Sequence, residues 1–156
     1  MADITILAWE PLFTMRLDVA YDDAQAIGGA SRLGIFPVRG GTFEGARLRG
    51  RVLPDGADWV TWRADGTMVI DVRTSLETQD GARIAMHYTG MVVPTSPQAA
   101  DRFARREPGS YEDLYLRTTP RFVTGHPDYD WLNRIVAVAN GMRTDAGPLY
   151  HVFEIK

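Results

Sequence analysis

The stretch from Gly56 to Gly81 constrains this chain most, because it alternates turn signals with strand-like runs. Asp65-Gly66 and Asp80-Gly81 are dipeptides typical of tight turns between antiparallel strands. Between them, residues 67–78 alternate aliphatic side chains with polar and charged ones. An alternation of period two is typical of a half-buried β-strand. The stretch therefore predicts consecutive antiparallel strands joined by short turns.

The rest of the chain repeats this pattern at a spacing of about ten residues. Strand-like runs are expected at residues 12–21, 33–38, 42–53, 58–63, 67–78, 83–93, 114–125, 135–143 and 149–155. Tandem glycine at Gly40-Gly41 predicts a turn or a bulge. Ser96 followed by Pro97 predicts the start of one short helix, and residues 128–133 predict a helical turn. This arrangement favours an all-β barrel or sandwich.

Composition narrows the class of protein. A length of 156 residues, with 45% hydrophobic and 24% charged residues, fits one soluble domain spanning residues 1–156. A net charge of -3 without a basic block argues against a nucleic-acid partner. No apolar run approaches the ~20 residues of a membrane helix. Without cysteines or a basic leader, we expect a cytoplasmic protein.

Several motifs, found in the same order along nearly the whole chain, resemble an uncharacterised protein family. The matching segments are Gly40 to Gly45, Gly56 to Trp59, Asp71-Val72-Arg73 with Thr78 to Gly81, Tyr115 to Thr118 with Pro120 and Phe122, and Tyr129 to Asn133. They resemble the domain of unknown function 3237, also called uncharacterised protein family 0311. The resemblance implies a single closed antiparallel β-barrel of the calycin or allene-oxide-cyclase kind. It also implies that the barrel is often a homodimer. Because the predicted helix is polar, we expect it at the surface or over one end of the barrel.

The predicted strands carry carboxylates beside aromatic and apolar residues. Asp58 precedes Trp59, so it is either a general acid or base whose pKa a dry site raises, or a cap of the preceding turn. Asp71 and Arg73 lie two residues apart and share a face. Alternation alone places that face outward, whereas the family resemblance keeps an inward, functional direction open. Glu44 is an acid either inside the barrel or at its rim.

Basic and aromatic residues supply candidates for ligand binding. Tyr115 and Arg117 share a face, and Arg117 is suited to hold a carboxylate, phenolate or enolate, or to form a strand-pinning salt bridge. Trp59, Trp62, Phe122 and Trp131 either wall a flat ligand or belong to the core. A resemblance to accessory proteins of aromatic and polyketide-like metabolism favours a small aromatic or apolar ligand.

The three histidines lack the spacing of metal ligands, so we expect no metal. His151 alternates with apolar residues, which favours an inward direction, and the direction of His87 is ambiguous. His87 and Tyr88 match no fixed position of the family. Glycine-rich phosphate loops are absent, so we expect no nucleotide cofactor.

These observations lead to one functional hypothesis and two alternatives. The hypothesis is a cofactor-independent enzyme that performs an isomerase, dehydratase, cyclase or lyase step by proton transfer on a small aromatic or polycyclic metabolite. The candidate catalytic residues are Asp58, Asp71, Arg73 and Arg117, and the candidate substrate-binding residues are Glu44, Trp59, His87, Tyr115, Phe122 and Trp131. The alternatives are a carrier of a small apolar ligand and a structural dimer module with a filled interior.

Overall fold

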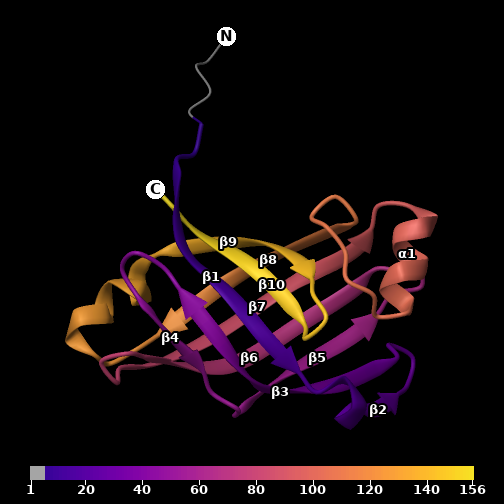
Figure 1. Cartoon of the computed structure of the whole chain (residues 1–156), viewed down its shortest axis with the longest axis horizontal. Coiled ribbons are helices and arrows are strands. Elements are labelled where there is room, and N and C mark those ends of the chain that lie inside the picture. The colour runs from indigo at the N-terminus through magenta and orange to yellow at the C-terminus, as the bar shows by residue number, and fades with distance from the viewer. Residues whose placement is uncertain (1–5) are drawn as a thin grey trace.

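The computed structural model describes residues 6–156, and strands make up most of it (Figure 1). The strands are β1 (Trp9–Val19), β2 (Gln25–Gly28), β3 (Leu33–Glu44), β4 (Arg49–Val52), β5 (Gly56–Trp62), β6 (Met68–Thr78), β7 (Arg83–Pro94), β8 (Leu114–Val123), β9 (Val136–Arg143) and β10 (Pro148–Ile155). The helical segments are η1 (Tyr21–Asp23), α1 (Pro97–Ala104) and η2 (Pro127–Arg134). No helix within residues 6–156 is long and apolar enough to span a membrane.

The strands close into an antiparallel barrel. The order runs β1-β10-β9-β8-β7-β6, then through β4 and β5 to β3, and β3 pairs back with β1. Because β4 and β5 each pair with both β3 and β6, they share one position, and the barrel has eight positions. Closure pairs the long edges that an open sheet would leave exposed. The predicted closed β-barrel is confirmed.

Local sequence signals form the turns and caps that they predict. Gly66 and Gly81 adopt positive φ angles of 85° and 88° in the turns that join β5 to β6 and β6 to β7. The Ser96 hydroxyl accepts a hydrogen bond of 3.1 Å from the Ala99 backbone and so caps α1. β3 has a bulge between Val38 and Gly40, and at the following Gly41 a Cβ atom would come within 2.0 Å of the Arg16 carbonyl oxygen. Glycine there lets β3 cross close to β1.

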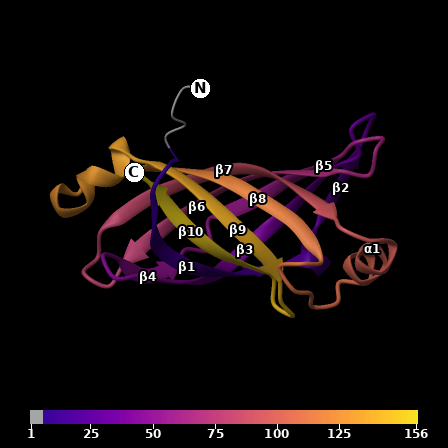
Figure 2. The same ribbon diagram turned by 90° about the horizontal axis from the view of Figure 1, so that it is seen from above.

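The two ends of the barrel differ in how they are filled. Toward η2 the interior is solid, because large inward side chains interdigitate there: Phe13, Met15, Phe43, Leu76, Ile84, Met86 and Phe122. Phe13 lies at the centre, with its ring 5.5 Å from that of Phe43 and 6.0 Å from that of Phe122. The opposite end lies next to α1 (Figure 2). The interior is hollow at that end.

Polar contacts close the η2 end. Asn133 donates a 2.9 Å hydrogen bond to the Thr124 carbonyl and accepts one of 2.8 Å from the Thr124 amide. The guanidinium of Arg47 lies 4.1 Å from the ring centroid of Trp131 and forms an ion pair with Glu154. These contacts tie η2 and the loop after β3 across the barrel end. The interior cavity lies at the other end, next to α1.

Candidate functional site

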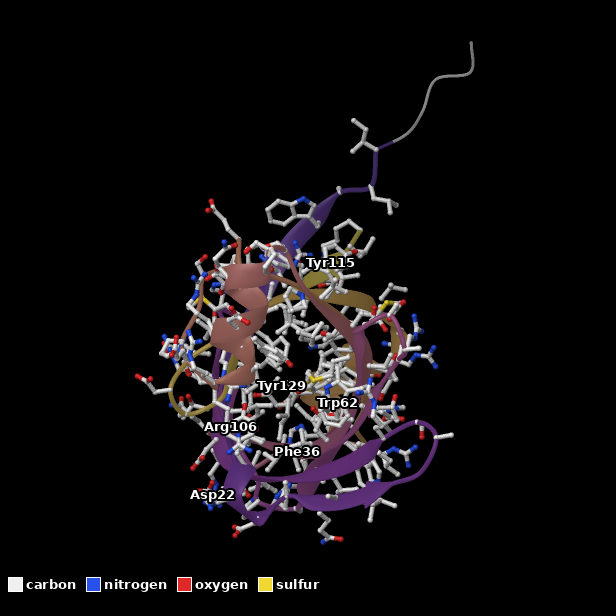
Figure 3. All side chains as sticks on the ribbon, turned by 90° about the vertical axis from the view of Figure 1, so that its right-hand side faces the viewer. Asp22, Phe36, Trp62, Arg106, Tyr115 and Tyr129 are labelled. Carbon is white, nitrogen blue, oxygen red and sulfur yellow. The ribbon has the colours of Figure 1, made fainter. Side chains whose placement is uncertain are left out.

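The candidate site is an interior cavity of about 320 Å³ at the α1 end of the barrel. Its walls are mostly apolar and include Phe36 on β3, Trp62 on β5 and Phe103 on α1. Figure 3 looks into this end, with α1 in front and Phe36, Trp62 and Arg106 around the opening. The Phe36 and Trp62 rings meet edge to face, with centroids 6.3 Å apart. Aromatic walls of this kind suit a flat, apolar ligand.

Asp58 is the carboxylic acid in this cavity. It follows the turn before β5 and lies on the inward face of that strand, with Val60 and Trp62. One carboxylate oxygen accepts a 3.2 Å hydrogen bond from the Asp71 amide. Burial raises the pKa of Asp58 to about 7, and the charge of Asp71 adds to this effect while the amide hydrogen bond opposes it. The carboxyl is therefore poised to exchange a proton near neutral pH.

Two buried tyrosines accompany Asp58. Asp58 lies opposite Val72, which lies opposite Tyr88, so β5, β6 and β7 present a row of residues to the interior. The rings of Tyr88 and Tyr150 meet edge to face at 5.4 Å, and Tyr150 lines the cavity. Burial raises the pKa of both phenols, and the nearby Asp58 adds to the effect. Both hydroxyls therefore keep their protons, and the buried Tyr88 hydroxyl has no hydrogen-bond partner within residues 6–156.

Two arginines lie at the other side of the cavity. Arg143, at the end of β9, is only 8% exposed, and its guanidinium lies 4.5 Å from the Tyr21 ring centroid and 5.6 Å from that of Phe103. Arg106 follows α1, is exposed, and lies 5.2 Å from the same Tyr21 ring. Burial raises the pKa of the Tyr21 hydroxyl, and the positive charge of Arg143 opposes that rise. The cavity thus has an acidic side and a cationic side.

Two residues that the sequence singles out, Asp58 and the possible ligand wall Trp62, line this cavity. The inward direction considered for Asp71 and Arg73 is wrong. Ile70, Val72 and Thr74 fill the inward positions of β6, so the alternating residues between them face outward. On that outer surface an Asp71 carboxylate oxygen lies 2.7 Å from Nε2 of His87, which is also partly exposed.

The other candidates on the strands also lie outside the cavity. Arg117 donates a 3.0 Å hydrogen bond to the Asn140 side chain, and its guanidinium lies over the exposed Tyr115 ring at 4.8 Å. It pairs with neither Asp71 nor Glu44. Trp59 is 39% exposed, and Glu44 is exposed at the end of β3. Each occupies the outward parity of its strand, which is why none of them reaches the cavity.

Phe122 and Trp131 face the opposite end of the barrel. Phe122 belongs to the solid core around Phe13. Trp131, on η2, packs against the guanidinium of Arg47. Both residues therefore have the structural role that was the alternative to lining a ligand site. No three histidine or carboxylate side chains within residues 6–156 gather as a metal site.

No sequence pattern predicted Tyr150, Arg106 or Arg143 as site residues, and Tyr88 was not among the candidates. The signal for Tyr88 was present, since it shares the parity of Ile84, Met86 and Val92 in β7. For Tyr150 the signal misled, because both faces of β10 carry apolar residues. His151, expected to face inward, instead lies on the outer side, where Nδ1 is 3.0 Å from the Thr14 hydroxyl. No local pattern marks Arg143 or Arg106, since only the packing of α1 against the barrel end places them.

The fold and the cavity together define a small closed antiparallel β-barrel with an interior pocket at one end. The chain belongs to the family described as "Protein of unknown function (DUF3237)", whose model matches residues 7–155. The family resemblance expected from the sequence is confirmed.

Individual relatives agree with this assignment. The UPF0311 protein RPA1785 of Rhodopseudomonas palustris is 34% identical over 70% of this chain and 71% of its own, and its crystal structure gives a TM-score of 0.90 over 98% and 100% of the two chains. A beta-barrel like protein of Acinetobacter baumannii has a TM-score of 0.83 and 33% identity over the whole of both chains. An enzyme from Penicillium herquei, 20% identical over 100% and 99% of the chains, has a TM-score of 0.74 and shows the shared fold alone.

Proposed function

We propose that this chain is a cofactor-independent enzyme that transfers a proton on a small aromatic or polycyclic metabolite held in the cavity. The observation that carries the proposal is the half-buried Asp58 in the cavity wall, whose pKa desolvation raises to about 7. A carboxyl with such a pKa is present in both protonation states near neutral pH, so it can accept and return a proton. The Penicillium herquei relative, whose description calls it an enzyme, lends this fold a catalytic precedent.

The reaction that suits these groups is enolisation. The Asp58 carboxylate removes a proton from a carbon next to a carbonyl group, and the electrons of that bond form an enolate. The Tyr150 hydroxyl donates a hydrogen bond to the enolate oxygen. Protonated Asp58 then returns the proton, either to a different carbon, which completes an isomerisation, or to a departing hydroxyl group, which completes a dehydration as water leaves. The proton balance closes within the site.

The walls support an aromatic substrate. Phe36 contacts Trp62 on one side and Tyr21 on the other, with ring centroids 6.3 Å and 6.1 Å apart. These rings and Phe103 surround a volume of about 320 Å³. A cavity of this size and lining holds one or two fused rings and excludes most water. Exclusion of water also keeps the pKa of Asp58 high.

A carrier of a small apolar ligand is the second candidate. It is favoured by the apolar walls, but a buried ionisable group costs stability and serves no purpose in a simple carrier. The third candidate is a structural module with a filled interior. The cavity argues against it, because only the half of the barrel toward η2 is filled.

The test follows proton exchange rather than a finished product. Proteins are mixed with small aromatic ketones, such as 2-tetralone, in deuterated buffer, and nuclear magnetic resonance follows deuterium incorporation beside the carbonyl. We expect the native protein to accelerate exchange and Asp58→Asn to lower the rate about 10²-fold or more. Glu44→Gln, at an exposed carboxylate outside the cavity, is the matched control and should retain the native rate. Equal rates for the native protein and Asp58→Asn would leave the carrier as the better description.

A further inference from the structure

The cationic side of the cavity has no role in the enolisation step, yet it is the more unusual part of the site. We infer that Arg143 and Arg106 bind a carboxylate on the ligand, so that the ligand is an aromatic carboxylate. The inference deepens the proposed function, because it names the substrate class. It does not need the reaction to be correct, since a carrier would select the same anion.

Arg143 is a buried cation without a charged partner, and this observation is the basis of the inference. Its Nε has no hydrogen-bond partner, and Arg143 forms no salt bridge within 4.0 Å in residues 6–156. Its neighbours are instead the rings of Tyr21 and Phe103, which hold the planar guanidinium by cation–π contact. Burying an unpaired charge is costly, so such a group is usually kept to bind an anion.

Arg143 also has the right position and geometry. It lines the cavity, so its remaining N–H groups can meet a ligand inside it. A guanidinium donates two parallel hydrogen bonds to a carboxylate, which fixes both the distance and the orientation of that group. The ring stacking fixes the guanidinium before the ligand arrives, so little side-chain entropy is lost on binding.

Arg106 supplies a second positive charge at the opening. It lines the cavity from the segment after α1 and has a positive φ of 59°, an uncommon conformation for a residue other than glycine. Its one ion-pair partner within residues 6–156, Asp22, is 3.6 Å away and 92% exposed, so solvent weakens that pair. Figure 3 shows Arg106 and Asp22 at the same side of the opening. Arg106 is therefore available to attract and hold an anion.

The two sides of the cavity then define the order of groups in the ligand. The carboxylate lies at Arg143 and Arg106, the aromatic rings lie between Phe36, Trp62 and Phe103, and the proton-bearing carbon lies at Asp58. A neutral ligand of the same shape would leave Arg143 buried and unpaired, so it should bind more weakly. The sequence predicted that Arg117 holds an anionic group, whereas we assign this role to Arg143.

Calorimetric titration with two matched probes tests the inference. 2-Naphthoate carries the carboxylate, and 2-naphthamide has the same shape without the charge. We expect the native protein to bind naphthoate at least tenfold more tightly than naphthamide. Arg143→Met, which keeps much of the side-chain volume, should weaken naphthoate binding roughly thirtyfold and change naphthamide binding little. Arg143→Lys should restore part of the difference, because it restores the charge without the fork geometry.

Further variants keep the test independent of folding and of the reaction. Arg106→Gln should weaken naphthoate binding severalfold, whereas Arg105→Gln, at the neighbouring exposed arginine that pairs with Glu107, should not. Asp58→Asn should keep the preference for naphthoate, so loss of proton exchange with intact anion binding separates the two proposals. Failure of the native protein to prefer naphthoate, an absence of measurable binding of either probe, or an unchanged preference in both Arg143→Met and Arg106→Gln would overturn the inference.

Discussion

Asp58 couples chemistry to stability because its proton is held differently in the folded and unfolded chain. The unfolded carboxyl releases its proton near pH 3.8, whereas burial raises the folded pKa to about 7. Between these values the folded state binds more protons, so stability falls as pH rises. Above pH 7 the loss of folding stability is complete. It is about 4 kcal/mol, because each unit of difference between the folded and unfolded pKa is worth 1.36 kcal/mol. The site therefore keeps a destabilising group, as catalytic sites commonly do.

Asp58→Asn should remove this pH dependence. We expect the variant to gain about 4 kcal/mol in free energy of unfolding, relative to the native protein, between about pH 4 and about pH 8. Urea denaturation at both pH values measures the difference. Glu44→Gln, at an exposed carboxylate outside the cavity, should show no comparable gain. A stability difference that does not change with pH would contradict the raised pKa.

At the scale of elements, α1 matters because a short, polar helix forms one wall of the opening. Its eight residues are too few to form a stable helix alone, so its caps and packing hold it in place. Ser96 caps its first turn, and Phe103 at its other end packs against Arg143. The helix therefore links a local sequence signal to the shape of the site.

Ser96→Ala should loosen this wall. Loss of the cap is expected to cost about 1 kcal/mol of stability, concentrated in α1 rather than in the barrel. Amide hydrogen exchange should become faster at Ala100 and Arg105, which bond within the helix, and stay unchanged in β6. Ser31→Ala, in an exposed loop, is the control and should leave exchange in α1 unaltered. Equal protection of α1 in both variants would show that the cap does not hold the helix.

At the scale of the whole molecule, the closed barrel leaves one large apolar groove on its outer surface. Strands β6 to β10 and the start of β1 form it, and its most exposed apolar residues are Trp9, Met91, Tyr115 and Val138. Exposed apolar grooves of this kind often mark contacts between proteins. The homodimer implied by the family resemblance stays a prediction, and this groove is the face on which we expect the second copy.

The predicted homodimer can be tested by its mass in solution. Light scattering after size-exclusion chromatography should give twice the 17.4 kDa chain mass for the native protein. Met91→Glu should shift the mass toward one chain, because it places a charge in the groove. Val123→Glu, at an exposed apolar residue that does not line the groove, should leave the mass unchanged. A single-chain mass for the native protein at all concentrations would contradict the prediction.

The sequence by itself determined most of the strands and the all-β class of fold. It did not predict β2, and it predicted two strands, 33–38 and 42–53, where β3 runs without a break from Leu33 to Glu44. Asp-Gly turns at 65–66 and 80–81, period-two alternation in β6, and the Ser96 cap are local signals, since each arises from the φ preferences or hydrogen bonds of neighbouring residues. Alternation also placed Asp71 and Arg73 outward. Asp58 was a candidate acid or base because it precedes Trp59 at the start of a predicted strand, and a cap of the preceding turn was the alternative.

Only the tertiary structure decided which residues form the site. Asp58, Tyr88, Arg143 and Tyr150 come from β5, β7, β9 and β10, and their distances depend on strand order and register. Local alternation gives each strand two faces, but in β10 both faces are apolar, so barrel closure alone selected the inward one. Bulky side chains fill the η2 half of the barrel, whereas the other half keeps a cavity that α1 covers. Such long-range packing leaves no periodic trace in the sequence, which is why the cationic side of the site was not foreseen.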